Sequence, residues 1–318
     1  MSNQLKCNGI AYLSVGVADM RIVEQLWIEQ FGLEVVARRI GPDTELARLW
    51  HVAAEQFVEQ LLLRTPGASA GYLHFVQFNQ PGDPVRMNAA STDLGAKNID
   101  VNCKGMPELV KNLQSAGYSF RSDIIEYDID GIRAQEVQMP VHDDINVVFI
   151  EVLSKGFEVN FTAQGFAALT SFVVVVPDAE QEADFYKKLF GFDEILRHEL
   201  SGAALEKAAA LPTGTVLDLH LLGRQDNVFG RMELIEYKGI KGVNHFKRAM
   251  PPATGILRCG FNIEVLDSFL KHAEKEHLQT GPVLEVDLIF GKGRMVELVS
   301  PAGLCLQVLV EQLRMPEG

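Results

Sequence analysis

Residues 11–20 read AYLSVGVADM and residues 170–179 read TSFVVVVPDA, and these two stretches decide how the whole chain folds. A shift of 159 residues places 11–78 on 170–237 without a gap, and apolar positions match nearly throughout. An ungapped match of this length does not arise by chance, so the chain contains an internal duplication.

The repeated unit predicts a strand, a helix and three further strands. Asp19 marks the start of the helix, because its carboxylate can accept the free amide protons of the first turn. Gly32 marks its end, where a left-handed residue is favoured. Alternating apolar residues over 34–40, 56–64 and 72–78 predict the three strands that follow.

The same order occurs twice more, in 96–153 and 257–311, so the chain holds four βαβββ modules. We place the modules at about 8–80, 94–154, 168–238 and 255–312. The polar connector 154–165 predicts the domain boundary, which gives one domain over 1–156 and a second over 166–318. One helix per sheet leaves the other sheet face free to curl. The predicted class is therefore α+β, with four tandem modules that form two similar half-barrels, or cups.

Composition excludes several function classes. The 318 residues carry a net charge of −13, which argues against binding to nucleic acid or to anionic membranes. No apolar run approaches the ~20 residues of a membrane span, and the first 15 residues do not resemble a signal peptide. The four cysteines lack metal-binding spacing. We expect a cytoplasmic protein with reduced thiols and a small-molecule substrate; a homodimer stays open.

The motifs resemble those of the vicinal oxygen chelate superfamily, which includes glyoxalase I, bleomycin resistance proteins and extradiol dioxygenases. Each half has V-x-D after its first strand and F-G after its helix. The tail SPAGLCLQVLV (300–310) is similar to the family ending DPxGxxIEL, with Ser300 for Asp and Gln307 for Glu. Four modules in one chain are typical of the extradiol dioxygenases. The resemblance implies that two modules form one cup, with metal ligands on the first and last strand of each.

Transferred to this sequence, the resemblance implies one candidate site in each half. The first set is Tyr12, His74, Asn98 and Glu151, and the second is Ser171, Glu233, Arg258 and Gln307. Arg258 carries a permanent positive charge where a cation would bind, so we expect an ion pair between Glu233 and Arg258 there.

The first cup is therefore the predicted active one. Alternation along its strands adds Ser14, Asp100 and Asn102 to its lining, which is too polar for an ordinary core. His74 and Glu151 are expected to meet there, while Phe75 and Ile150 face the helices. A strand histidine can also be a satisfied core residue.

Two versions of the chemistry follow. In one, His74 and Glu151 hold a divalent iron, manganese or zinc ion in a dioxygenase-like or glyoxalase-like enzyme. In the other, no metal is present: His74 with Glu151 or Asp100 performs acid–base catalysis, and Tyr12 and Asn98 stabilise an oxyanion. The second version is an isomerase, lyase or cyclase. Both act on a small oxygenated metabolite, including an aromatic one. The alternative is a non-catalytic binding or resistance protein.

Two further histidines, outside the candidate sites, are given separate predictions. His220 replaces the Leu61 of the first half and is expected either to face the second cup or to be buried with a partner. Residues 142–144, His-Asp-Asp, are expected to form an exposed turn.

Overall fold

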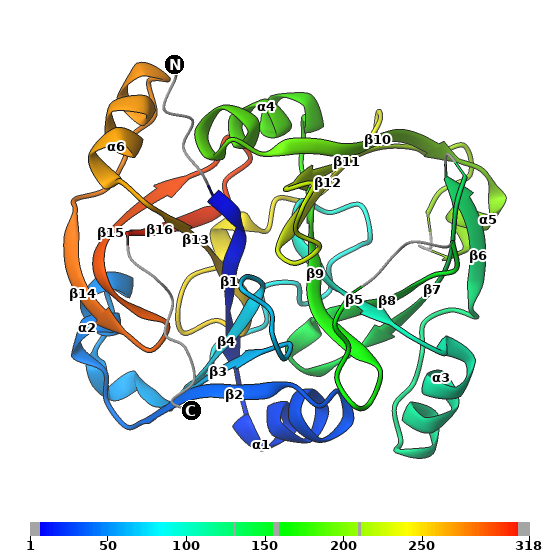
Figure 1. Ribbon diagram of the computed structural model, residues 1–318, viewed down its shortest axis with the longest axis horizontal. Helices are drawn as coiled ribbons and strands as arrows, with labels where there is room; N and C mark the ends of the chain where they lie inside the picture. Colours follow the sequence, from blue (N-terminus) through cyan, green and yellow to red (C-terminus); the bar gives the residue numbers. More distant parts are fainter. Residues whose placement is uncertain (1–6, 130, 155–158, 209–210, 311–318) are drawn as a thin grey trace.

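A computed structural model of the chain describes residues 7–129, 131–154, 159–208 and 211–310. It contains two eight-stranded sheets, and each sheet curls into a half-barrel (Figure 1). This confirms the predicted α+β class and the two cups. The predicted boundary at 156 and the end of the last module lie outside the described residues.

Each module gives a strand, a helix and three strands, as predicted. The first module comprises β1 (Cys7–Val17), α1 (Met20–Val23) with the π-helical η1 (Glu24–Gln30), β2 (Glu34–Ile40), α2 (Thr44–Trp50), η2 (Ala54–Gln56), β3 (Phe57–Arg64) and β4 (Tyr72–Phe78). The second comprises β5 (Gly95–Cys103), α3 (Met106–Ser115), β6 (Ile125–Ile129), β7 (Ile132–Pro140), η3 (His142–Asp144) and β8 (Asn146–Val152).

The second half of the chain repeats these elements. The third module comprises β9 (Phe166–Val175), α4 (Ala179–Phe190), β10 (Asp193–Ser201), α5 (Ala203–Ala208), β11 (Val216–Gly223) and β12 (Arg231–Tyr237). The fourth comprises η4 (Phe246–Arg248), β13 (Gly255–Ile263), α6 (Leu266–Lys275), β14 (Leu284–Leu288), β15 (Gly291–Val299) and β16 (Cys305–Val310). The short helices α2 and α5 were not anticipated from the sequence.

The internal duplication is confirmed strand by strand. The bounds of β3 and β4 shift by 159 residues onto those of β11 and β12, and the strand order β1-β4-β3-β2 recurs as β9-β12-β11-β10. The helix signals also hold: the carboxylate of Asp19 accepts a hydrogen bond from the N–H of Arg21, and Gly32 has φ of 73°.

The modules do not pair in the order expected. Modules one and four share one sheet, joined by antiparallel β1 and β13, and modules two and three share the other, joined by β5 and β9 (Figure 1). The expectation that modules one and two line one cup is therefore wrong. Each module leaves one edge of its first strand unpaired. A repeat defines that edge without specifying which other module it joins. We call the cup of modules one and four the terminal cup and that of modules two and three the central cup.

The two sheets meet at related glycines. The Ile10 N–H donates to Gly230 O at 2.7 Å, and the Gly71 N–H donates to Ile10 O at 2.8 Å. Both glycines have positive φ, and a Cβ at Gly230 would lie 2.3 Å from Ile10 O. No residue with a side chain fits at this contact between the sheets.

Among the described residues, no helix is long and apolar enough to cross a bilayer.

Candidate functional site

His74 lies inside the terminal cup with none of its surface exposed. Its Nδ1 is 2.9 Å from Ser14 Oγ, and its Nε2 is 3.1 Å from Gln60 Oε1. Gln60 Nε2 donates in turn to Asp43 Oδ2 at 2.8 Å. Burial lowers the pKa of His74 to about 3, so the ring is neutral. Because Gln60 Oε1 can only accept, the ring proton lies on Nε2 and the Ser14 hydroxyl donates to Nδ1.

Aromatic side chains fill the rest of the terminal cup. The rings of Tyr12 and Phe290 stack with centroids 3.8 Å apart, and Trp50 at the end of α2 packs against His74 at 6.3 Å. The Tyr12 hydroxyl donates to Gln307 Oε1 at 3.0 Å. All five side chains are buried. The terminal cup is thus a packed core, and His74 has the surroundings of a core histidine with both ring nitrogens engaged.

Glu151 does not meet His74, so this prediction is wrong. Its carboxylate accepts hydrogen bonds from the backbone N–H groups of Gly105 and Met106, at 2.6 and 2.8 Å, where α3 begins. Gln135 Nε2 also donates to it at 2.6 Å. Glu151 therefore holds the start of a helix, a position that favours a carboxylate.

The register of β8 explains the error. Val147 and Phe149 belong to the core beneath the helices, so the alternate residues Val148 and Ile150 face the cup. The prediction placed the inward-facing position of β8 at Glu151, one residue after Ile150. Phe75 faces the helices as expected, whereas Ile150 does not.

The expected ion pair between Glu233 and Arg258 is also absent, because β12 and β13 belong to different sheets. The Arg258 guanidinium donates to the carbonyls of Ala249 and Leu257, at 2.7 and 2.9 Å. Its Nε lies 3.5 Å from a carboxylate oxygen of Glu297. Arg258 therefore stabilises the terminal cup without Glu233.

The central cup has one polar wall and one apolar wall. The polar wall comes mainly from module two and includes Lys97, Asn98, Asp100, Tyr127, Glu136, Gln138 and Asn146, together with Glu233 of module three. The apolar wall comes from module three and includes Val173, Val175, Leu217, Leu219 and Ile235. Lys97, Tyr127, Glu136, Leu219 and Glu233 are partly exposed, so solvent reaches this interior.

A bulge in β5 adds a cation to the polar wall. The register with β9 shifts between Ala96 and Asn98, which makes Lys97 an extra residue, so that Lys97 and Asn98 both reach the cup. Lys97 Nζ donates to the Tyr237 hydroxyl at 2.8 Å. The Asn98 side chain accepts a hydrogen bond from Asn146 Nδ2 at 3.1 Å. These bonds fix the first strand of the cup.

Three carboxyls face this interior, and burial raises the pKa of each. For Glu233 the pKa rises to about 7, with the charge of Glu136 as a second cause. For Asp100, which is 2% exposed, Glu233 is the second cause. Asp100 Oδ2 accepts from Ser171 Oγ at 2.6 Å, whereas its Oδ1 has no partner among the described residues. The Lys97 charge opposes the shift in all three.

These pKa values suit proton transfer. A carboxyl with a pKa near 7 is present in both forms at neutral pH, so Glu233 can take up a proton or give one away. Burial also raises the pKa of Tyr127, which keeps its hydroxyl protonated and able to donate a hydrogen bond.

Neither cup has a donor set that fits a catalytic metal. In the terminal cup both nitrogens of His74 are engaged and the Arg258 guanidinium lies on the paired strand. In the central cup, Asp100 and Glu233 occupy positions on the first and last strands that could supply metal ligands. The apolar Val148 occupies another such position. The described part of the chain contains no group of three His, Cys, Asp or Glu side chains that could hold one ion. Three protein ligands are usual for a catalytic zinc.

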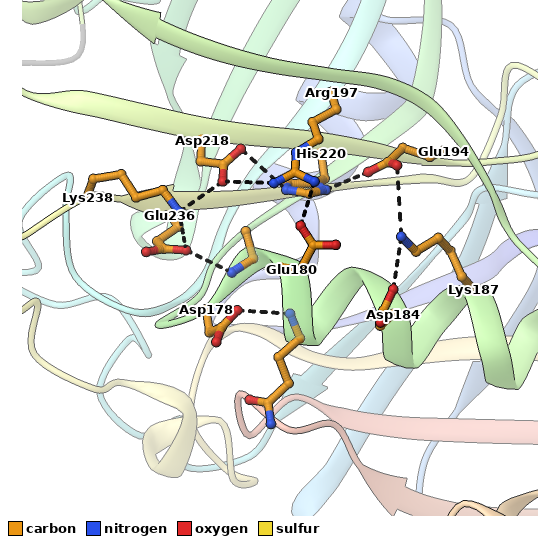
Figure 2. A network of polar contacts seen from close by, with 12 residues as sticks. Asp178, Glu180, Asp184, Lys187, Glu194, Arg197, Asp218, His220, Glu236 and Lys238 are labelled. Atoms are coloured by element: carbon orange, nitrogen blue, oxygen red, sulfur yellow. Dashed lines mark hydrogen bonds and ion pairs between the residues drawn. The ribbon is translucent and has the colours of Figure 1, made fainter.

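His220 faces neither cup. It lies on the other side of β11, under α4, with Glu194 Oε1 2.6 Å from its Nδ1 and Asp218 Oδ1 3.3 Å from its Nε2 (Figure 2). Lys238 extends this network to Asp218 at 2.9 Å. Of the two predicted positions, the buried one with partners is confirmed.

The turn at 142–144 is less exposed than expected. The side chains of His142 and Asp143 are only 6% and 7% exposed. Trp27 Nε1 donates to His142 Nε2 at 3.0 Å, and the Ala18 N–H donates to Asp143 Oδ1 at 3.2 Å. The turn therefore ties module two to the first helix of module one.

A hollow of about 840 Å³ lies outside both cups. It is lined by the loops around 67–69, 159–161 and 226–229. Glu151 is at its edge but is already bonded to the start of α3. No chemistry is assembled there comparable with the central cup.

Sequence reasoning found Asn98 and Asp100 but missed Lys97, Tyr127 and Glu136. Glu136 could have been found by reading the alternation of IRAQEVQMP (132–140), which places it on the same face as Gln138. Lys97 could not, because only the bulge brings it to the cup face.

Two curled sheets built from βαβββ modules are the fold expected from the resemblance to the vicinal oxygen chelate superfamily, although the modules pair differently from the expectation. Comparisons with solved structures agree. The chain is similar to glyoxalase I from Zea mays, with a TM-score of 0.63 and 12% identity, over 95% of this chain and 92% of that one. It is also similar to a putative dioxygenase from Bacillus subtilis, with a TM-score of 0.60 and 12% identity, over 96% of this chain and 86% of that one.

At 12% identity these likenesses concern the fold alone. No family model matches the chain, and no curated protein matches it. Function must therefore be argued from the residues of the central cup.

Proposed function

We propose that the protein is an acid–base enzyme that moves a proton on a small oxygenated metabolite bound in the central cup, as an isomerase, lyase or cyclase does. One observation carries the proposal. Glu233 is partly exposed in this cup, makes no hydrogen bond or ion pair with any described residue, and has its pKa raised to about 7. A free carboxyl of this kind is the expected state of a general base.

The neighbouring groups support complementary roles. Glu233 takes a proton from a carbon next to a carbonyl group, and the Tyr127 hydroxyl donates to the oxygen on which negative charge develops. Asp100 is buried beside them, accepts a hydrogen bond from Ser171 Oγ, and has its pKa raised by that burial. In this proposal Asn98 and Asp100 line the active cup, whereas His74, Tyr12 and Glu151 take no part in the chemistry.

Hydrogen exchange tests the proposal directly. Protein treated with a chelator is incubated in D2O with a panel of small ketones, aldehydes and thioesters, and deuterium uptake is followed by NMR. We expect uptake at a rate that rises with pH around a midpoint near 7, as Glu233 becomes ionised. Glu233→Gln should lower the rate by about 100-fold or more. His74→Gln, the matched change in the terminal cup, should leave it unaltered.

Each contrary result has a definite meaning. Loss of exchange in His74→Gln but not in Glu233→Gln would place the chemistry in the terminal cup. Loss of exchange after chelation, with recovery on adding back a metal, would contradict a metal-independent reaction.

A second candidate is a non-catalytic binding or resistance protein. A cup with one polar and one apolar wall is also suited to binding a ligand without reaction. This candidate would be favoured if panel compounds bound in the central cup and the wild-type protein exchanged none of their protons.

A further inference from the structure

The polar wall of the central cup has more hydrogen-bond acceptors than donors. No described residue donates to Glu233, and Glu136 accepts only from Gln138 Nε2, at 3.2 Å. Asp100 is almost completely buried, yet its Oδ1 has no partner among the described residues. A buried oxygen without a donor is costly, and such atoms mark positions where a bound group completes the structure.

The cup also has more acidic than basic side chains. Lys97 is the basic residue whose charge acts on all three carboxyls, and its Nζ is already bonded to the Tyr237 hydroxyl. Arg121 donates to Asn146, and Arg231 donates to the carbonyl of Asn227, so neither neutralises these carboxyls. Fully ionised, the three acids exceed the one lysine by two charges.

An aromatic ring stands beside the acids, and aliphatic groups stand across the cup from them. Tyr127 lies close enough to Glu136, Glu233 and Asp100 for each to act on its pKa. A phenol ring attracts a cation over its face. The apolar wall across the cup offers a surface for hydrocarbon.

We infer that the ligand of the central cup carries a protonated amine, held by Glu136 and the ring of Tyr127, with its hydrocarbon part on the apolar wall. This inference rests on the proposed function, because it names the substrate class of the same site. An ammonium group supplies the donors and the positive charge that the cup lacks. Its charge also favours the ionised form of Glu233, so the substrate itself prepares the base.

Three ligands that differ only at one end test the inference on the wild-type protein: 2-phenylethylammonium, 2-phenylethanol and phenylacetate. Calorimetric titration at pH 7.5 should give affinity at least tenfold higher for the ammonium compound than for the alcohol, with phenylacetate weakest. Equal affinity for the ammonium compound and the alcohol, or tightest binding of phenylacetate, would overturn the inference.

Two variants locate the binding group. Glu136→Gln should lose about tenfold in affinity for the ammonium compound and none for the alcohol. Glu126→Gln makes the same charge change on β6 at an exposed residue paired with Arg133, and it should change neither affinity. An equal loss in both variants would show only a general effect of net charge and would also overturn the inference.

The outcome can be separated from that of the proposed function. Proton exchange on neutral carbonyl compounds, without preference for the ammonium ligand, would leave the function standing and remove the inference. Selective binding of the ammonium ligand, without exchange of any proton by the wild-type protein, would do the reverse.

Discussion

The two cups descend from one repeated unit and differ in whether they are filled. Positions 159 residues apart can be compared directly. Gln60 and His74 are buried in the terminal cup, whereas their counterparts Leu219 and Glu233 are partly exposed in the central cup. The same backbone therefore supports a closed core or an accessible interior, and the side chains decide which.

Two side chains close the terminal cup. Phe290, which stacks on Tyr12, has Gly131 as its counterpart, and a glycine cannot fill the central cup. Asp43 caps the start of the short helix α2, and its side chain accepts from two backbone N–H groups, whereas the counterpart before α5 is Gly202. The counterpart of Trp50 is residue 209, which lies outside the described residues. Among the described residues, the central cup therefore has no side chain in place of Phe290.

The largest expected effect comes from removing the Trp50 side chain, which helps to fill the terminal cup. Trp50→Ala should lower the free energy of unfolding by about 4 kcal/mol, because it leaves a large cavity in a closed core. Leu219→Ala, in the accessible cup, should cost about 1 kcal/mol, because water already reaches that side chain. Urea unfolding measures both. Similar losses would contradict the difference between the cups.

A smaller effect is expected from exchanging matched residues on β3 and β11. Gln60→Leu should cost about 2–3 kcal/mol, because it leaves the buried Nε2 proton of His74 without an acceptor and removes one of the donors to Asp43. The reciprocal change, Leu219→Gln, should cost under about 0.5 kcal/mol, since its amide can bond to water. Thermal unfolding of both variants measures these losses. A loss of stability in Gln60→Leu as small as that in Leu219→Gln would show that the hydrogen bonds of Gln60 contribute little.

Acid should destabilise the terminal cup. The pKa of His74 is about 3 when folded, against ~6.5 when unfolded, so the unfolded chain binds the proton more tightly. The associated stability is complete above pH 6.5 and falls as pH drops below it, by about 2 kcal/mol at pH 5. His74→Gln should flatten this part of the pH profile of unfolding. An unchanged profile would mean that the ring is protonated in the folded protein.

The central cup should respond in the opposite direction and more weakly. The pKa of Glu233 is raised to about 7 when folded, so stability from this group is complete below its unfolded pKa and is lost as pH rises through 7. Partial exposure reduces the effect to about 1 kcal/mol. Glu233→Gln should therefore be more stable than wild type at pH 8 and similar to it at pH 4. Lower stability of the variant at pH 8 would show that the ionised carboxylate has a partner.

Sequence reasoning was sufficient for most strands and for the main helix of each module. Alternation over 72–78 gave β4, and the Asp19 and Gly32 signals gave the ends of the first helix. It was insufficient where two modules meet. The edge contacts between β1 and β13 leave no pattern in either segment, so the pairing of modules could not be deduced, nor that β4 with His74 and β8 with Glu151 belong to different sheets.

Two other errors at the site have local causes. Glu151 was misplaced because one residue of register reverses the face of a strand. Lys97 was missed because a bulge breaks the alternation on which the prediction depended.

The pairing of the first and last modules imposes an order on biosynthesis. The strands of the central cup, from β5 to β12, leave the ribosome as one continuous stretch and can close on themselves at once. The first module is finished at residue 78, but β13, which covers the edge of β1, ends at residue 263. At ordinary translation rates that is a wait of roughly 10–40 s. During that time β1 presents an apolar edge to other nascent chains, so the closed half of the protein is the one that needs protection from aggregation while it is made.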